Sequence, residues 1–263
     1  TWNLSGADAE LLQVSRFGVV SVKNAGKLDF EDKPTWQFGL SATDAAGNES
    51  QPIDVNVQVG NLDEVAPEIT SSAVAAVNEN VPGGSAVYTV VSDDSRDISG
   101  GVSYSLKTGL EDDAAAFTIN ESSGAVTINV SPDFESKSGY TFTVAATDAA
   151  GNATEQAVYL AINDVNEAPV LALEMDDQTG TEDTSFSFTV PTETFTDVDN
   201  ATLAYSLGAG SPDWLSIDEV SGEIGGTPPT NFNGTVRVTV VATDAGGLSA
   251  SGDFDLTIGA VND

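Results

Sequence analysis

The sequence of 263 residues contains no cysteine and no histidine, one methionine, and only eight lysine and arginine residues. The absence of cysteine excludes disulfide bridges and thiolate metal sites, and the absence of histidine excludes imidazole ligands. No apolar run is long enough to form a membrane-spanning helix, and no signal peptide is visible. Any metal site in this chain must therefore use oxygen ligands.

Basic residues are outnumbered by 41 acidic ones, which gives a formal net charge of −33. Phosphate backbones and anionic membranes repel such a chain, so we expect neither nucleic-acid binding nor membrane insertion of this segment. Apolar residues make up 40% of the sequence and recur in regular short runs, which is typical of a folded chain. A folded chain with this charge needs a counterion where its carboxylates gather.

One acidic turn recurs along the chain. The stretch "ATDAAGN" at residues 42–48 is repeated letter for letter at 146–152, and a near copy, "ATDAGG", stands at 242–247. The spacing of the first two copies indicates repeats of about 100 residues, which is an ordinary domain size. We therefore predict three domains, at residues 1–60, 66–164 and 168–260.

Each acidic turn lies between two segments that alternate apolar and polar residues, the pattern of half-buried strands. The segments before the turns place Trp36, Phe38 and Leu40, then Tyr140, Phe142 and Val144, then Val236, Val238 and Val240 on one face. Those after the turns begin at Ile53, Val158 and Phe254. Many short strands separated by Gly, Asn, Asp and Pro, with no helical periodicity, predict an all-β chain of tandem antiparallel β-sandwiches of Greek-key type.

The first repeat is shorter than the others. Residues 73–91 supply two opening strands to repeat two, and repeat one has no counterpart of them. We therefore expect an incomplete sheet in repeat one, with the missing strands upstream in a parent protein of which this chain is a fragment. An unpaired strand edge promotes aggregation, and native proteins cover such edges.

Short acidic linkers at residues 60–69 and 162–171 join the repeats. Asp148 follows the end of a strand and projects from one pole of its sandwich, whereas Asp133-Phe134-Glu135 lies at the opposite pole. At the second linker we expect a convergence of acidic residues: Asp133, Glu135, Asp164, Glu167, Asp197, Asp199 and Asp244. Two carboxylates about 4 Å apart repel by roughly 4 kcal/mol at an effective dielectric constant of about 20, so the linkers need a cation. Calcium accepts six to eight oxygen ligands and is the favoured occupant.

A simpler interpretation is open for each acid taken alone. Short acidic linkers are ordinarily solvated and flexible, and surface charge also serves solubility. Solubility explains the net charge, but it does not explain why the same groups recur at the ends of the repeats.

The quoted segments resemble cadherin repeats, and bacterial ones more than animal ones. The resemblance is carried by Leu28-Asp29-Phe30-Glu31, the "ATDAAGN" turns, Asn78-Glu79-Asn80 and the acidic linkers that end in proline. Repeat three, with "TDVDN", "PDWLSIDEVSGEIGGTP" and "ATDAGG", is similar to the dystroglycan-type cadherin-like domain of large bacterial surface proteins. The resemblance implies tandem Ig-like/cadherin-like sandwiches in an extended array, with about three calcium ions at each complete junction.

Carried over residue by residue, the resemblance implies two sets of calcium ligands. The first junction group comprises Asp29, Glu31, Asn61, Asp63, Glu64 and Asp148, with Asp93, Asp94 or Asp97 in place of a clean Asp-x-Asp motif. The second junction group comprises Glu79, Asp133, Glu135, Asp164, Asn166, Glu167, Asp197, Asp199 and Asp244. Repeat three has Asn231-Phe232-Asn233 in place of Asp-Phe-Glu, which leaves only Glu182 and Asp263 as candidates for a third junction.

The predicted function is that of a calcium-binding extracellular segment of a bacterial surface adhesin, stiffened by calcium and supporting adhesion. Its partners would be calcium and the adjacent repeats. The alternative is a module that binds carbohydrate or a second copy of the adhesin, which would require exposed aromatic residues. Alternation places Trp36 in the core, and Trp214 opens a strand and is expected there too. We do not expect an enzyme, because the acids lie at domain ends without a nucleophile or a cleft signature.

Overall fold

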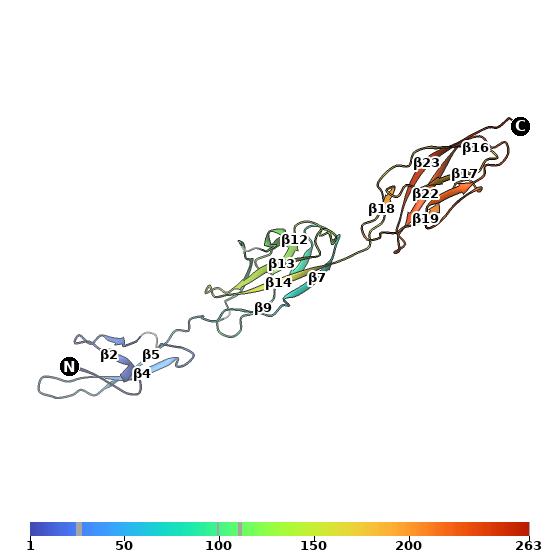
Figure 1. Cartoon of the computed structure of the whole chain (residues 1–263). Coiled ribbons are helices and arrows are strands. Elements are labelled where there is room, and N and C mark those ends of the chain that lie inside the picture. The colour runs from blue at the N-terminus through green and yellow to red at the C-terminus, as the bar shows by residue number, and fades with distance from the viewer. Residues whose placement is uncertain (25–27, 99, 110–111, 263) are drawn as a thin grey trace. The chain divides into compact units, whose positions relative to one another are not determined.

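The structure is a computed structural model that describes residues 1–24, 28–98, 100–109 and 112–262. Its elements are strands and short 3₁₀ turns, as the alternating patterns predicted, and the described residues include no helix long and apolar enough to cross a membrane (Figure 1). The chain divides into two compact units. The first contains Thr1–Val77, Val81–Pro132 and Gly139–Ala161, and the second contains Asn78–Asn80, Asp133–Ser138 and the residues from Ile162 onward. The first junction group lies wholly in the first unit, and the second junction group lies wholly in the second unit.

Repeat one consists of two small sheets. A three-stranded sheet has the order β1-β4-β5, and β2 and β3 form a hairpin. The elements are β1 (Trp2–Ser5), the 3₁₀ turn η1 (Ala9–Leu11), β2 (Leu12–Val14), β3 (Val20–Val22), β4 (Thr35–Ala42) and β5 (Ile53–Gln58). Its small core contains Leu12, Trp36 and Phe38. The predicted central strand is confirmed as β4, and Trp36 is a core residue.

Repeat two forms a complete sandwich. A four-stranded sheet of order β10-β13-β14-β7 is accompanied by a three-stranded sheet of order β11-β12-β8, and a short β6-β9 pair lies beside them. The elements are β6 (Glu68–Ile69), β7 (Val74–Asn78), β8 (Ala86–Thr89), β9 (Ser92–Asp93), β10 (Ser103–Leu106), η3 (Ala114–Ala116), β11 (Phe117–Ile119), β12 (Ala125–Ile128), β13 (Gly139–Thr147) and β14 (Ala153–Asn163). Phe142, Val144, Val158 and Leu160 are fully buried, which confirms the alternation of β13 and β14.

Repeat three has the same plan. Its sheets have the orders β16-β23-β22-β19 and β17-β21-β20, with a short β15-β18 pair. The elements are β15 (Val170–Leu171), β16 (Gln178–Thr181), β17 (Phe186–Thr189), β18 (Phe195–Thr196), β19 (Ala204–Leu207), β20 (Leu215–Ile217), β21 (Glu223–Gly226), β22 (Gly234–Thr243) and β23 (Ser249–Gly259). Val238, Val240 and Leu256 are fully buried, and Trp214 packs against this core as predicted.

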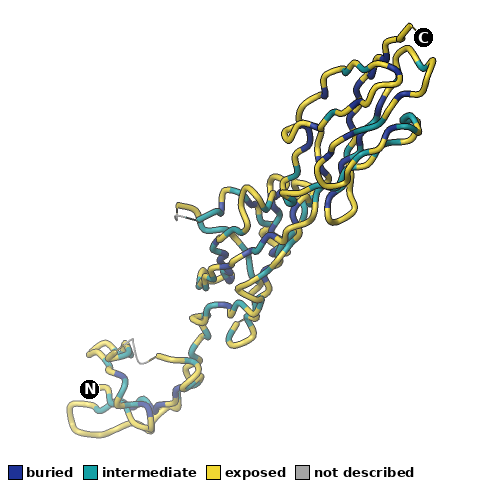
Figure 2. The backbone as a smooth tube through the Cα atoms, turned by 45° about the vertical axis from the view of Figure 1, so that its right-hand side comes forward, coloured by how far each residue is buried: buried dark blue, intermediate teal, exposed yellow. Residues whose placement is uncertain are grey.

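The two complete repeats differ from repeat one by one strand in each sheet. The strands β7 and β8 of repeat two correspond to β16 and β17 of repeat three, and no described strand of repeat one takes these places. Figure 2 shows the consequence, because buried segments follow the strands of repeat three but are sparse near the N-terminus. Within the described residues, repeat one therefore has three strands in one sheet and two in the other, and its incompleteness stays a prediction.

Candidate metal centre

The aspartate of each acidic turn first builds the turn itself. One carboxylate oxygen of Asp44, Asp148 and Asp244 accepts the backbone N–H four residues later, at distances of 2.9, 2.9 and 2.8 Å. The glycine three residues after each aspartate has φ between 89° and 97°, a region that glycine enters without steric cost. These glycines are Gly47, Gly151 and Gly247. The recurring Asp and Gly are thus required by local geometry.

The second and third turns are also tied to the linker that precedes them. Asn152 donates from its side chain to Asp148 Oδ2 at 3.0 Å and to the carbonyl oxygen of Asp63 at 2.9 Å. In the third turn Asn166 of the linker donates to Asp244 Oδ2 at 2.8 Å. Asp148 and Asp244 are buried, whereas Asp44 is exposed and bonds only within its own turn. Linker contact therefore distinguishes the two junction turns from the first.

Glu79 forms the buried base of the second junction group. Its side chain is 4% exposed, and its two oxygens accept the backbone N–H groups of Phe134 at 2.7 Å and Val165 at 2.8 Å. The next residue, Asn80, adopts φ 61° and donates to the Glu167 carboxylate. The end of β7 thereby holds a carboxylate between the Asp-Phe-Glu segment and the linker.

Two carboxylate triads lie beside this base. Glu79, Asp133 and Glu135 can place one oxygen each within 4.8 Å of one another, and so can Glu135, Asp164 and Asp199. Glu135 belongs to both triads. Anionic oxygens this close repel strongly unless a cation or a proton lies among them. The structure thus brings together four members of the predicted convergence at the second linker, Asp133, Glu135, Asp164 and Asp199, and adds Glu79, which the resemblance implied.

The remaining members of the second group join through hydrogen bonds. Asp199 Oδ2 accepts the backbone N–H of Glu167 at 2.7 Å, and Asp197 Oδ1 accepts the N–H groups of Asp199 and Asn200. The Asn200 side chain donates to Asn166 Oδ1 at 3.0 Å. The Asp-x-Asp segment and the linker are therefore locked to each other within the second unit.

The first junction group forms one triad. Glu31, Glu64 and Asp97 bring one oxygen each within 4.8 Å of one another. Asp97 accepts hydrogen bonds from the Asn61 side chain at 3.0 Å and from the Glu64 backbone N–H at 3.3 Å. Asp97 thus corresponds to Asp199, which bonds the linker glutamate in the same way. Asp29 lies at the start of its turn, where its carboxylate accepts the Glu31 N–H at 3.0 Å.

The other two candidates for the missing Asp-x-Asp motif behave differently. Desolvation, followed by the charges of Asp63 and Asp148, raises the pKa of Asp94, so this carboxylate faces the linker and the acidic turn. Asp93 instead accepts a hydrogen bond from the backbone N–H of Ser95 at 3.0 Å, and hydrogen bonds from the side chain and then the backbone of Ser95 lower its pKa. Of the three candidates, Asp94 and Asp97 are brought to the junction, whereas Asp93 forms a local turn.

Charge repulsion is evident at both junctions. Desolvation, then the carboxylates of Glu31 and Asp97, raises the pKa of Glu64. Desolvation and the charges of Asp199 and Glu79 likewise raise the pKa of Asp164, and desolvation raises that of Glu167. These shifts mean that the ionised carboxylates lack compensation from the protein alone.

Several oxygens in the two groups are buried without a hydrogen-bond donor, which is costly unless a ligand is bound. Among the described residues they are Asn61 Oδ1, Asp63 Oδ1, Asp94 Oδ2, Glu167 Oε2, Asp197 Oδ2 and Asp199 Oδ1. The donor set is entirely carboxylate and amide oxygen, which fits a hard cation such as calcium. The residues present therefore fit the ion that the sequence predicted.

Sequence reasoning omitted Asn80, Asn152 and Asn200 from the ligand sets, although each joins the junction network. The asparagine at the end of the repeated "ATDAAGN" turn was a visible signal for Asn152. At the far end of repeat three, Glu182 is buried and one of its oxygens accepts the Val261 N–H at 2.7 Å. The other candidate there, Asp263, lies outside the described residues.

Comparison with protein families gives two matches. Residues 73–163 match the cadherin domain family, and residues 168–259 match a family described as putative Ig domain. Cadherin domains are non-enzymatic adhesion modules that typically depend on calcium.

Relatives and solved structures agree with these matches. The chain is 31% identical over 258 residues to the protocadherin-like wing polarity protein stan of Drosophila melanogaster, covering 92% of this chain and 7% of that protein. It is 39% identical over 108 residues to Cadherin-17 of Rattus norvegicus, covering 40% of this chain and 13% of the relative. The chain thus spans a small part of each relative. These relatives are animal proteins and give no support to a bacterial source.

The fold is similar to a crystal structure of mouse protocadherin-24 EC1-3, with a TM-score of 0.63 at 22% identity, covering 99% of this chain and 90% of that chain. Mouse cadherin-23 EC22-24 gives a TM-score of 0.60 at 22% identity, covering 99% and 86%. The predicted fold class is confirmed. The chain therefore consists of tandem cadherin-like β-sandwiches, with a cadherin domain at residues 73–163 followed by a putative Ig domain at residues 168–259.

Proposed function

We propose that this chain is a calcium-binding segment of an extracellular adhesion protein, and that calcium at the two junction groups stiffens the connections between repeats. The observation that carries the proposal is the pair of carboxylate triads that share Glu135. Mutual repulsion makes this arrangement unfavourable without a cation, and oxygen-only ligands favour calcium. The proposed domains are those predicted from the sequence, at residues 1–60, 66–164 and 168–260.

At the second junction, Glu79, Asp133 and Glu135 would hold ions from the side of repeat two. Asp164, Asn166 and Glu167 would contribute from the linker, and Asp197, Asp199 and Asp244 from repeat three. Glu135 would bridge two ions because it belongs to both triads. About three ions at this junction remain our expectation.

At the first junction, Glu31, Glu64 and Asp97 would hold an ion directly, with Asp29, Asn61, Asp63, Asp94 and Asp148 as further ligands. Asp97 would replace the missing Asp-x-Asp motif, since it bonds the linker glutamate as Asp199 does. The described residues bring a single triad together at this junction. We therefore propose fewer ions at the first junction than at the second.

The mechanical consequence follows from shared coordination. Without an ion, the carboxylates of each junction repel one another, and this repulsion favours separation of the linker from the repeats. A bound ion would coordinate the same oxygens and hold them together. Extracellular calcium modules bind with dissociation constants of about 10⁻⁴ to 10⁻³ M. The stiffness of the chain would therefore respond to calcium at ordinary extracellular concentrations.

Recognition of carbohydrate is less well supported. Stacking on sugars requires exposed aromatic faces, but Trp36 is 3% exposed and Trp214 packs against the core of repeat three. The Trp2 side chain is 41% exposed, and its indole ring lies against Gly18 of the β2-β3 hairpin. Two of the three tryptophans are therefore unavailable for stacking on a sugar.

Calorimetric titration with calcium tests the proposal. The unaltered chain should bind several ions and unfold at a higher temperature when calcium is present. Glu135→Gln should remove more than one ion, because this carboxylate is shared by two triads. Asp253→Asn is the matched control, since Asp253 pairs with Arg237 on the surface of repeat three and should leave calcium binding unchanged. An unaltered chain that takes up no calcium at millimolar concentration would overturn the proposal.

A further inference from the structure

The β2-β3 hairpin of repeat one ends in an exposed apolar tip, which comprises Ser15–Val19 and is called here the repeat-one tip. In this tip Phe17 is 74% exposed and Val19 is 63% exposed. The guanidinium carbon of Arg16 lies 4.6 Å from the centre of the Phe17 ring, which is a cation–π contact. Aromatic residues and arginine are enriched in protein interfaces. The repeat-one tip therefore has the composition of a contact site.

Local contacts hold the repeat-one tip in its conformation. The Ser15 hydroxyl oxygen accepts the backbone N–H groups of Phe17 at 3.3 Å and Val19 at 3.1 Å. Gly18 adopts φ 82°, and a Cβ there would meet the Trp2 ring at 3.0 Å, so this ring packs directly against the backbone of the tip. A contact site that is fixed in advance loses less conformational entropy on binding than a flexible one.

The corresponding hairpin tips of the other two repeats have the opposite charge. In each repeat a side-chain oxygen caps the turn by accepting two backbone N–H groups. The capping residues are Ser15, Asn120 and Asp218. The residue after the cap is Glu121 or Glu219 in the later repeats but Arg16 in repeat one. Repeat one therefore places one of the eight basic residues of the chain where the other repeats place a carboxylate.

Repeat three contains a pocket that is complementary to the repeat-one tip. This repeat-three pocket has a volume of about 620 Å³ and lies between the start of β19, the β20-β21 hairpin tip and the acidic turn. Its apolar lining includes Leu203, Tyr205 and Val220, and Val220 is 86% exposed. Glu219 also lines it, and among the described residues no lysine or arginine does. The pocket therefore offers apolar side chains beside a carboxylate.

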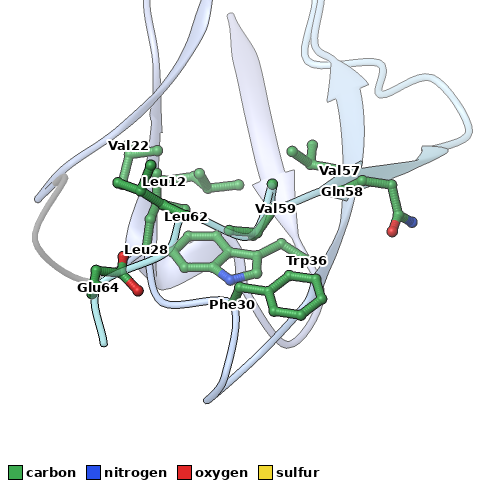
Figure 3. A pocket seen from close by; sticks show the side chains of 11 residues that line it. Leu12, Val22, Leu28, Phe30, Trp36, Val57, Gln58, Val59, Leu62 and Glu64 are labelled. Atoms are coloured by element: carbon green, nitrogen blue, oxygen red, sulfur yellow. The ribbon is translucent and has the colours of Figure 1, made fainter. Parts of the chain in front are cut away.

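The apolar pocket of repeat one does not offer the same combination. It has a volume of about 360 Å³, and the core residues Leu12 and Trp36 line it together with Glu64 of the first junction group (Figure 3). Its only acidic lining residue is therefore already assigned to a proposed calcium site. In the repeat-three pocket Glu219 belongs to neither junction group, so its carboxylate is available to a partner.

We propose that the repeat-one tip of one molecule docks in the repeat-three pocket of a second copy of this chain. Phe17 would contact the apolar lining, and Arg16 would pair with Glu219. Two chains that each carry a net charge of −33 repel one another, so a contact that sets a cation against a carboxylate is favoured over other encounters. The adhesive role of this contact rests on the proposed function, but the contact itself uses no member of a junction group as an ion pair.

Sedimentation equilibrium of the 263-residue chain tests the association, in chelator and again in millimolar calcium. The average mass should rise with the concentration of the chain in both solutions. Arg16→Glu should weaken the association at least tenfold, because like charges would then face each other. Lys23→Glu is the matched control, since Lys23 lies just after β3 and bonds the Glu10 carbonyl oxygen, and it should associate as the unaltered chain does. An unaltered chain that stays monomeric in both solutions would overturn the proposal.

Exchange of the two charges locates the contact. Glu219→Arg alone should weaken the association at least tenfold, and a chain that carries both Arg16→Glu and Glu219→Arg should associate again. Both side chains are exposed, so the variants should fold. A double variant that associates no better than either single variant would contradict the pairing of Arg16 with Glu219.

A spin label identifies the surfaces that meet. The chain contains no cysteine, so Ser21→Cys in β3 gives a single attachment point near the repeat-one tip. Mixed with an isotope-labelled copy that carries no spin label, this chain should broaden the amide signals of Leu203, Tyr205 and Val220 in that copy. Broadening confined to other surfaces would overturn the docking. If the chain binds no calcium, the proposed function fails, and the mass and broadening measured in chelator still decide this contact.

Discussion

At the scale of single residues, one aspartate can serve both the fold and a ligand site. Asp44, Asp148 and Asp244 all close the same turn with one oxygen, but only Asp148 and Asp244 offer the other oxygen to partners tied to a linker. In the described residues the hydrogen bonds of Asp44 lie within its own turn, which shows that the aspartate builds the turn by local contacts alone. The recurrence of "ATDAAGN" is therefore evidence for a turn, and only contact with a linker makes it evidence for a metal centre.

The first residue-scale prediction concerns Glu79. Replacing it with alanine leaves the part-buried N–H groups of Phe134 and Val165 without their acceptors. Each unsatisfied group costs about 1–3 kcal/mol, so Glu79→Ala should destabilise the calcium-free chain by about 2–4 kcal/mol in urea denaturation. Glu155→Ala, which breaks an exposed pair with Lys107, should cost less than about 1 kcal/mol. Equal effects of the two variants would contradict this account of Glu79.

The second residue-scale prediction concerns pH. The pKa values of Glu64, Asp94, Asp164 and Glu167 are raised, chiefly by desolvation and then by neighbouring charges. The folded calcium-free chain thus binds protons more readily than the unfolded chain at these groups, so stability falls as pH rises through their folded pKa values. The melting temperature in chelator should increase from pH 7 toward about pH 5 and fall below about pH 4, where acids with lowered pKa values such as Asp148 become protonated. With calcium present the trend from pH 7 to 5 should reverse, because protons compete with the ion. A melting temperature in chelator that falls steadily from pH 7 to 5 would contradict the prediction for the calcium-free chain.

At the scale of strands and turns, alternation predicted β4, β13 and β22 because each has neighbours on both edges and one buried face. The same pattern in β5 predicted a strand but not its exposure, since Ile53 is 70% exposed where no described strand covers it.

The triad Glu79-Asp133-Glu135 could be predicted from family resemblance, because its members follow fixed motifs. The roles of Asn152 and Asn200 could not, because they depend on how each turn meets its linker. Asp93 and Asp97 are both aspartates of the same short segment. Only the folded structure shows that Asp97 bonds the linker, whereas Asp93 forms a local turn.

Turn geometry gives an element-scale prediction. Gly151 adopts φ 97° and a Cβ there would meet no atom within 4 Å, so Gly151→Ala should cost about 1–2 kcal/mol from backbone strain alone. Gly60→Ala is the control, because a Cβ at Gly60 also meets nothing within 4 Å and its φ is ordinary. Chemical denaturation of both variants measures the difference. A Gly151→Ala chain as stable as the parent would show that the turn tolerates another conformation.

Core packing gives another prediction at this scale. Phe142 is fully buried and touches Tyr88 and Phe117, with ring centroids 6.0 and 4.5 Å away. Phe142→Ala should destabilise repeat two by about 3–5 kcal/mol. Val74→Ala, at a position 62% exposed in β7, should change stability by no more than about 0.5 kcal/mol. Urea denaturation followed by tyrosine fluorescence reports chiefly on this repeat, which contains four of the five tyrosines. A small loss for Phe142→Ala would mean that the core is less tightly packed than described.

At the scale of the whole molecule, a net charge of −33 sets the behaviour of the chain. Two of the places where carboxylates gather are the junction groups, and each contains buried oxygens that lack donors. Calcium would therefore act as a structural component. At 1 mM calcium, a site with a dissociation constant of 10⁻⁴ M stabilises the folded state by about 1.4 kcal/mol. Thermal unfolding should shift upward in calcium and return to its starting value in chelator, while magnesium should have a weaker effect.

Diffraction from crystals grown with millimolar calcium, with anomalous data collected, tests the central claim most directly. The account predicts anomalous peaks among Glu79, Asp133, Glu135, Asp164 and Asp199, and a further peak among Glu31, Glu64 and Asp97. Density at both places that contains only water, with the carboxylates turned apart, would contradict it.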